Sequence, residues 1–260
     1  MKKLLKLLIM ICIIASASPA LAMFTNGGFE AGNFNGWTIT YGNSYNNTAS
    51  PSWTGGYNGY GNVTPTIVDS TTYPNASKYV PIDINPYNGT KMAQINDMVG
   101  YWHSTKISQT ATISADDIGD TLYVNWGVIL EDPSHPTIDL PYFSIKVLNG
   151  STVLDSFAAN SDQAATSWTK IGTGWGGSYT YYTTGQYTYN LGSGFAVGDQ
   201  ITIEMFVSDC GQGGHGALAF LDGIGTEYVP PPGTVPIPPT AYLLAAGLLG
   251  TIGLRRKAKK

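Results

Sequence analysis

Aromatic side chains set among Asn, Gly and Ser are the residues of this sequence whose types best suit ligand recognition. Residues 23–229 contain six Trp and sixteen Tyr. A sugar ring has C–H groups that pack on flat aromatic rings, and its hydroxyls bond to Asn, Gln and Asp. The composition therefore suits carbohydrate binding, with core or cross-strand packing as the alternative for each ring. The predicted ligand-binding rings, each next to loop residues, are Trp53, Tyr57, Tyr60, Trp102, Trp175 and Tyr181. Trp37 and Trp126 are expected in the core.

A glycine-rich stretch, residues 208–216, places Asp209, Cys210 and His215 close together in sequence. These residue types occur in metal sites and in Cys–His catalytic pairs. Soft metals usually take three or four ligands, and the other histidines, His103 and His135, are far away in sequence. We therefore predict a structural loop, whose glycines permit positive φ, with Cys210 as a small buried side chain.

Carboxylates for glycoside hydrolysis would have to come as a pair on opposite sides of the scissile bond. Glu131, Asp132 and Glu204 are candidates, but no spacing identifies an acid and its partner. The acidic run 116–120 predicts a turn, because its spacing does not fit an EF-hand loop. The sequence thus predicts a protein that is not an enzyme, with a polysaccharide hydrolase or lyase as an alternative.

Short alternating segments of apolar and polar residues predict the elements that position these side chains. Asn149-Gly150 favours a type I′ hairpin turn, and residues 41–77 are expected to form long loops. The expected strands are 107–113, 121–130, 143–148, 152–157, 187–191, 200–208 and 217–224. The predicted fold class is all-β: a single antiparallel β-sandwich of the jelly-roll type, flanked by an N-terminal signal helix and a C-terminal hydrophobic helix.

The N-terminus has the pattern of an export signal. Three lysines precede an apolar stretch, and Ala20-Leu21-Ala22 forms a small-x-small cleavage site, so residues 1–22 are predicted to be a signal peptide. The predicted β-sandwich domain, residues 23–229, contains five lysines, no arginine and 17 acidic residues, a formal charge of −12. Nucleic acid is excluded as a partner, because phosphate binding needs clustered Lys or Arg.

The C-terminus has three parts. A Pro-rich linker and motif occupies 230–239, a 15-residue apolar run follows at 240–254, and a basic cluster ends the chain at 255–260. As a helix the run would reach about 22 Å, less than the ~30 Å hydrocarbon core. The motif residues are Val235, Pro236, Ile237, Pro238 and Pro239, followed by Arg255 and Arg256.

This tail, 235–260, resembles the PEP-CTERM class of sorting signals in its VPxPP variant. The resemblance implies transient insertion in the inner membrane of a Gram-negative bacterium and processing by an exosortase. It also implies release to the cell surface or extracellular matrix, commonly alongside exopolysaccharide. An ordinary C-terminal membrane anchor is the alternative.

The opening Asn26-Gly27-Gly28-Phe29-Glu30-Ala31-Gly32 and the later Leu221-Asp222-Gly223-Ile224 resemble the terminal strands of galactose-binding-like β-sandwiches, which include carbohydrate-binding modules. The resemblance implies one structural Ca²⁺ near the paired terminal strands, with Glu30 and Asp222 at the carboxylate positions. Gly223 departs from the pattern, because many relatives have an acidic residue or Asn there. The alternative is that turn amides satisfy both carboxylates.

Together these features predict an exported, non-enzymatic surface or matrix protein that binds polysaccharide. A structural or adhesive surface protein without sugar binding is the main alternative.

Overall fold

A computed structural model describes residues 23–73, 81–173, 177–192 and 194–228. The predicted signal peptide, Trp175, the linker, the sorting motif and the hydrophobic tail lie outside the described residues. Among the described residues, none of the helices has the length and apolar character needed to cross a membrane.

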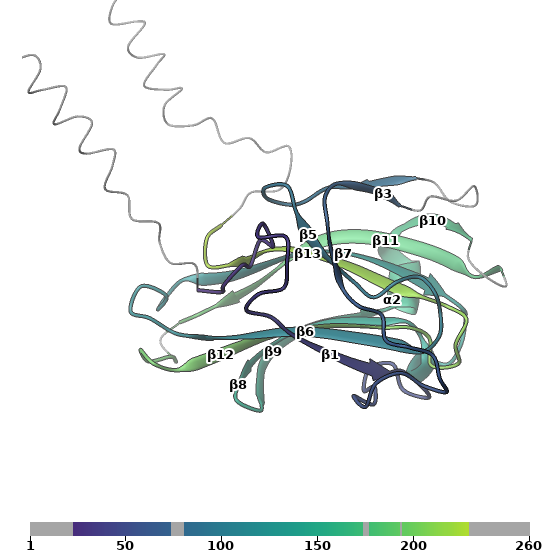
Figure 1. Cartoon of the computed structure of the whole chain (residues 1–260), viewed down its shortest axis with the longest axis horizontal. Coiled ribbons are helices and arrows are strands. Elements are labelled where there is room, and N and C mark those ends of the chain that lie inside the picture. The colour runs from purple at the N-terminus through teal and green to yellow at the C-terminus, as the bar shows by residue number, and fades with distance from the viewer. Residues whose placement is uncertain (1–22, 74–80, 174–176, 193, 229–260) are drawn as a thin grey trace, which may run out of the picture.

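Two antiparallel sheets are stacked as a sandwich (Figure 1). The first sheet has the order β1-β6-β12-β8-β9 and the second the order β10-β11-β7-β13-β5-β2. Strands of the first sheet are β1 (Thr38–Asn43), β6 (His103–Thr112), β12 (Gln200–Ser208), β8 (Tyr142–Asn149) and β9 (Thr152–Asn160). Strands of the second sheet are β10 (Thr169–Thr173), β11 (Tyr179–Asn190), β7 (Thr121–Asp132), β13 (Ala217–Gly225), β5 (Met92–Ile95) and β2 (Thr66–Val68). The predicted all-β sandwich is thus confirmed, and the helix α2 (Ser161–Ser167) is a short connection capped by Asn160.

The main core lies between the two sheets. Alternate residues of each strand point inward, so Leu122, Val124, Val128 and Leu130 of β7 are buried in one cluster with the inward residues of β8 and β12. Trp37 belongs to the same cluster, and Trp126 packs against it, as the sequence predicted.

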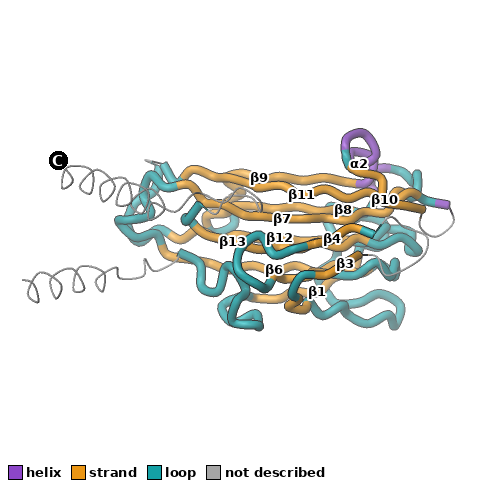
Figure 2. Tube along the Cα trace, turned by 90° about the horizontal axis from the view of Figure 1, so that it is seen from above, coloured by secondary structure: helices purple, strands orange, loops and turns teal. Residues whose placement is uncertain are grey.

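A second, smaller core covers the outer face of the second sheet. The hairpin β3 (Thr71–Tyr73) and β4 (Ile82–Ile84) lies over this face (Figures 1 and 2). Ile84 packs with Met92, Ile129 and Phe220, side chains that point away from the main core. The sheet is therefore buried on both faces over part of its area, and the edge of the covering segment borders a cavity.

Strand prediction was accurate where alternation was strong. The expected strand 200–208 coincides with β12, and 217–224 matches β13 to one residue. The hairpin β8–β9 is present, but Asn149 pairs with Thr152, so the turn residues are Gly150 and Ser151. Only Gly150 of the two has positive φ, the feature of a type II′ turn, so the predicted Asn-Gly type I′ turn was one residue out of place.

The N-terminal segment differs from the expected terminal strand. Residues 25–32 form turns, and Asn26 and Phe29 both have positive φ. Phe24 and Phe29 are fully buried and belong to the main core. The Ile224 amide donates to the Gly27 carbonyl, so the segment still meets β13 without adding a strand to the sheet.

Candidate functional site

A cavity of about 490 Å³ opens on the outer face of the second sheet; we call it the face pocket. Its floor is a cross-strand row in which Thr184, Gly127 and Phe220 lie side by side. Because Gly127 has no side chain, the sheet is hollow between its neighbours. A Cβ at position 127 would lie 3.3 Å from the Thr184 methyl. Residues 83–87 form the opposite wall.

The rows on either side of this floor have opposite character. On one side lie Gln186, Asn125 and Asp222, and on the other Tyr182 and Ile129. Strand register produces this division, because outward-facing residues two apart on each strand fall into adjacent rows. The pocket therefore offers a ring surface next to a line of hydrogen-bonding groups.

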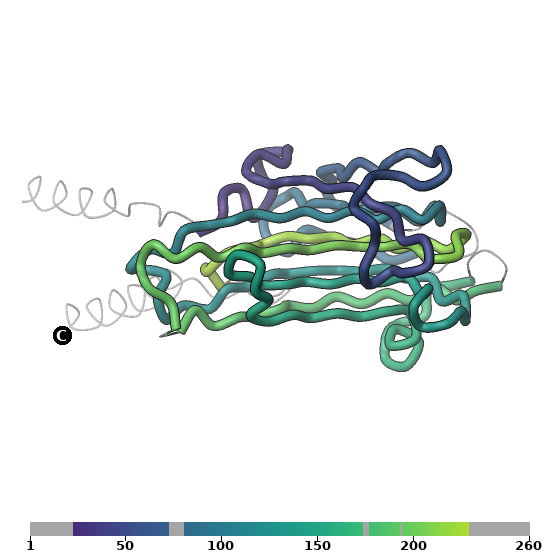
Figure 3. The backbone as a smooth tube through the Cα atoms, turned by 90° about the horizontal axis from the view of Figure 1, so that it is seen from below, coloured from purple at the N-terminus to yellow at the C-terminus, as the bar shows by residue number. Residues whose placement is uncertain are grey.

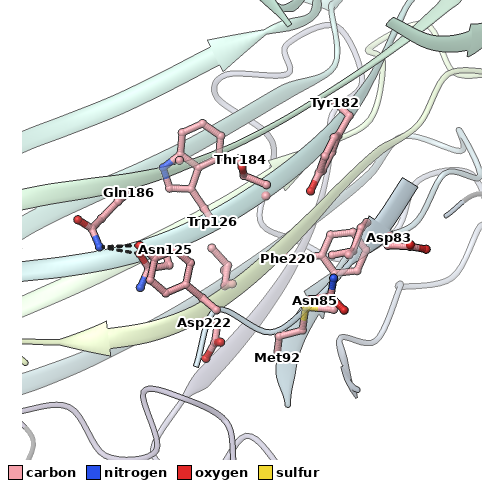
Figure 4. Close-up of a pocket in the computed structure, with 15 residues that line it drawn as sticks. Asp83, Asn85, Met92, Asn125, Trp126, Tyr182, Thr184, Gln186, Phe220 and Asp222 are labelled. Carbon is pink, nitrogen blue, oxygen red and sulfur yellow. Dashed lines mark hydrogen bonds between the residues drawn. The ribbon is translucent and has the colours of Figure 1, made fainter. Parts of the chain in front are cut away.

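The polar row is organised by hydrogen bonds (Figure 4). The Gln186 amide donates to Asn125 Oδ1 at 2.8 Å and, more weakly, to the Tyr87 hydroxyl at 3.4 Å. Asn125 Nδ2 donates to the Gly223 carbonyl at 3.3 Å. These bonds fix the orientation of both amides while Gln186 stays partly exposed to the pocket.

Asp222 is a buried carboxylate at the end of the polar row. Its Oδ2 accepts the Asn88 amide at 2.8 Å, and its Oδ1 accepts the Gly223 amide. Burial raises the pKa of Asp222 to about 7, against the effect of these amide donors. Asp222 thus changes charge near neutral pH.

Glu30 is the second carboxylate that accepts hydrogen bonds from the turn 87–91. Its Oε1 accepts the amides of Thr90 and Lys91 at 2.9 and 2.8 Å, and its Oε2 accepts the Thr90 hydroxyl. Burial alone would raise the pKa of Glu30, but these donors outweigh it and lower the pKa.

The predicted calcium site can be compared with this arrangement. Ca²⁺ requires six to eight oxygen ligands, whereas all four carboxylate oxygens of Glu30 and Asp222 already accept N–H or O–H groups. The arrangement fits the alternative in which turn amides satisfy both carboxylates. Calcium binding itself stays a prediction.

A second group of rings lies at one end of the sandwich, and we call it the aromatic platform. It consists of Tyr45, Tyr57, Tyr60, Tyr101 and Trp102. Tyr45 stacks on Tyr57 with centroids 4.3 Å apart, and Tyr60 stacks on Tyr101 at 4.4 Å. Trp102 lies between the two pairs, 5.5 Å from Tyr57 and 5.6 Å from Tyr60. Tyr45, Tyr60 and Tyr101 are each at least 40% exposed, so the platform faces solvent.

The platform rests on the 208–216 loop. Trp102 has a positive φ of 60°, an uncommon conformation for a bulky residue. Its Nε1 donates to the Gly211 carbonyl at 3.0 Å, and a Cβ at Gly213 would lie 2.7 Å from its ring. Figure 3 shows the loop after β1 crossing the same end of the sandwich, where the Asn46 amide donates to the Gly211 carbonyl.

The predicted ligand-binding rings have three different fates. Tyr57, Tyr60 and Trp102 meet in the platform. Trp53 lies apart, against Phe206 and under the Lys106 ammonium on the outer face of the first sheet. The prediction that Tyr181 binds ligand was wrong, because this residue is 8% exposed and belongs to the main core. Odd-numbered residues of β11 point inward there.

Trp126 borders the pocket, but its ring lies on the other side of the sheet. The ring stacks on Phe157 at 5.0 Å and contacts Phe143 at 5.5 Å, both in the first sheet. It also occupies the space over Gly185, where a Cβ would lie 2.5 Å away. Trp126 therefore supports the pocket from beneath.

The carboxylates considered for hydrolysis do not meet. Glu131 is on β7 of the second sheet, buried, and accepts the Gly216 amide. Glu204 is on β12 of the first sheet and forms a 3.0 Å ion pair with Lys106. Asp132 accepts the amide of Ser134. This separation leaves Glu131 and Glu204 without the shared site that an acid–base pair requires.

Comparisons with known proteins give a fold likeness and no family. No protein-family model matches the chain, and no curated protein matches it. Among solved structures, a carbohydrate-binding module specific for non-crystalline cellulose (CBM28) is 15% identical, with a TM-score of 0.37, over 81% of this chain and 96% of that one.

Two further solved structures resemble the chain. One, from a study of promiscuous carbohydrate-binding modules of the β-sandwich superfamily, is 13% identical with a TM-score of 0.39, over 81% of this chain and 63% of that one. The other is the enzymatically active domain of tailspike protein 4 of bacteriophage CBA120, 14% identical with a TM-score of 0.38. The match covers 80% of this chain and 22% of the tailspike chain. Likenesses this weak carry no argument, and the β-sandwich arrangement rests on the strand pairing of this chain itself.

Sequence reasoning missed most of the face pocket. Asn125 and Gln186 are amides inside apolar or alternating strands, and Gly127 interrupts the apolar-rich stretch 121–130, so the signal was present. Tyr45 and Tyr101 were also missed, because loop neighbours cannot be deduced from spacing.

Proposed function

We propose that this chain is an exported protein whose β-sandwich binds a polysaccharide in the face pocket. The observation that carries the proposal is that the ring of Tyr182 and the floor residue Phe220 line the same pocket as a polar row, Gln186, Asn125 and Asp222. A pyranose has the same division between C–H faces and hydroxyl edges, so the two surfaces complement each other.

The side chains of the polar row are already oriented to bind hydroxyl groups of a sugar. Gln186 is held by Asn125 and retains free hydrogen-bonding capacity, since a primary amide has two donors and two acceptor lone pairs. Because both amides are already oriented, binding orders few side chains, which favours affinity. At about 490 Å³ the cavity accommodates one or two sugar residues of a longer chain.

Export is supported by the signal-like residues 1–22 and by the tail 235–260, whose resemblance to exosortase substrates suggests release at the cell surface or in the matrix. The acidic domain suits a soluble extracellular protein, since a net charge far from zero keeps proteins soluble.

A structural or adhesive role is the second candidate, and the aromatic platform favours it. Three tyrosines exposed by 40–45% form one surface, and exposed aromatic clusters are typical of contact surfaces with other proteins. The platform and the face pocket lie on different parts of the molecule, so the two roles can be separated by mutation.

A glycan array with the purified full chain tests the proposal. Tyr182→Ala removes the pocket ring, and we expect about a tenfold loss of affinity for any retained glycan. Tyr179→Ala is the matched control, because Tyr179 lies on the same strand, is 44% exposed and is outside the pocket. Retention that depends equally on both tyrosines would rule out the face pocket as the sugar site, and no retained glycan would remove the sugar-binding role.

A further inference from the structure

Three metal-ligating side chains from two separate parts of the chain meet at the 208–216 loop. His135 lies between β7 and η1 (Thr137–Asp139), and its Nδ1 is 3.1 Å from Cys210 Sγ. The rings of His135 and His215 are nearly perpendicular, with centroids 5.1 Å apart. One ligand atom from each of the three residues lies within 4.8 Å of the other two. An ion with ligand bonds of about 2.0–2.3 Å fits between atoms at that separation.

We propose that His135, Cys210 and His215 bind one transition-metal ion of borderline or soft character, of the class of Zn²⁺ and copper. Two imidazole nitrogens and a thiolate suit such ions, whereas Ca²⁺ and Mg²⁺ prefer oxygen. Three protein ligands leave a fourth position for water or an added ligand. Binding replaces the Cys210 thiol proton, so one proton is released to solvent for each ion bound.

The loop holds the ligands in place through its own backbone. The Gln212 amide points at Cys210 Sγ at 3.4 Å, and the Cys210 amide donates to the His215 carbonyl at 3.0 Å. Gly214 donates to the Gly100 carbonyl, and Gly216 donates to Glu131. An amide directed at sulfur stabilises a thiolate, and the remaining bonds fix the spacing of Cys210 and His215.

The surrounding charge favours a cation. Asp139 and Asp209 are both buried near Cys210, and Asp139 Oδ1 has no hydrogen-bond partner among the described residues. A divalent ion bound at the cluster would compensate the charge of the Cys210 thiolate and of the nearby Asp139 carboxylate.

The exposure and the position of the three side chains also fit a metal site. Cys210 and His215 are buried, while His135 is partly exposed, so an ion would reach the cluster past His135. The sequence argument against a metal was that His135 and His103 are distant from the loop. The fold removes that argument, because it brings His135 to Cys210 and places His103 3.4 Å from Asp209.

Titration calorimetry on the metal-free full chain, produced without a histidine tag and kept reduced, tests the proposal. We expect one Zn²⁺ per chain, proton release, and a higher Tm with Zn²⁺. Co²⁺ as a spectroscopic probe should give thiolate-to-metal charge-transfer absorption that Cys210→Ser abolishes. Mg²⁺ should leave the Tm unchanged, because it prefers oxygen ligands.

Two histidine variants make the assignment specific. His135→Gln removes a partly exposed ligand and should weaken Zn²⁺ binding at least tenfold while leaving the metal-free Tm nearly unchanged. His103→Gln is the control, since His103 lies with Asp97 and Asp209 in a neighbouring cluster. The proposal is overturned if Zn²⁺ does not bind, or if His103→Gln abolishes binding and His135→Gln does not.

Discussion

The face pocket and the aromatic platform both offer rings beside polar groups, but different structural elements hold them. The pocket side chains stand on paired strands, and the register of β11, β7 and β13 sets each row. The platform rings stand on loops, and Trp102 keeps its place through contacts with Gly211 and Gly213. A substitution in the pocket should therefore alter side chains on the binding surface. A substitution beneath the platform should displace the backbone of the loops that support it, which we call the frame.

A matched pair of Gly→Ala substitutions gives the largest expected contrast. A Cβ at Gly100 would lie 2.1 Å from the His215 backbone nitrogen, so Gly100→Ala must push the 208–216 loop away. A Cβ at Gly127 would meet the Thr184 methyl at 3.3 Å, and a side chain can move. We expect Gly100→Ala to lower the free energy of unfolding by about 3 kcal/mol and Gly127→Ala to change it by less than ~1 kcal/mol. Urea denaturation of both variants measures this, and equal losses would contradict the contrast between frame and surface.

The same difference explains which parts of the structure could be predicted from sequence. Strands with strong alternation, such as β12 around Ile201 and Ile203, were placed correctly because a buried face demands a period of two. Trp37 and Trp126 were also assigned correctly to the core. Tyr181 was misassigned because the Gly- and Ser-containing residues 173–178 that precede it are typical of a loop, while strand parity turns its ring inward.

Contacts between distant loops could not be predicted. His135 and Cys210 are separated by 75 positions, and no periodicity relates them. The terminal strand expected at 26–32 was wrong for a related reason: Asn26 and Phe29 adopt positive φ, which breaks an extended segment into turns.

The buried carboxylate of the pocket predicts a pH dependence of stability that the platform lacks. The folded-state pKa of Asp222, about 7, exceeds the value of 3.8 expected when it is unfolded. The folded protein therefore binds more protons between these values, so this contribution to stability is full below pH ~4 and is lost as the pH rises through 7. We expect the free energy of unfolding to be lower at pH 8 than at pH 5 by on the order of 2 kcal/mol, measured in EDTA.

Asp222→Asn separates this effect from that of other groups. Burial also raises the pKa of Asp209, followed by the effect of Asp97, so Asp209 contributes a slope of the same sign in both proteins. The difference between wild type and Asp222→Asn thus reports Asp222 alone. Parallel pH profiles for the two proteins would show that Asp222 is ionised in the folded state throughout this range.

A double substitution in the platform tests whether its function is separate from that of the pocket. Tyr45→Ser with Tyr101→Ser removes two exposed rings and leaves Trp102 and its bond to Gly211 in place. We expect less than a twofold change in glycan affinity and, if the platform mediates contact between chains, a lower apparent mass in light scattering. A glycan affinity that falls tenfold would show instead that the platform is the sugar site.

Removing calcium should produce the smallest effect. Amides of residues 88, 90, 91 and 223 satisfy Glu30 and Asp222 from within the chain, so their oxygens need no cation for compensation. We expect EDTA to leave the Tm at pH 7 unchanged within about 1 °C once zinc and copper have been excluded from the sample. A fall of several degrees that Ca²⁺ reverses and Mg²⁺ does not would place calcium at the turn 87–91. Asp222→Asn would then lose the response, because an amide supplies one neutral oxygen where the ion needs a charged one.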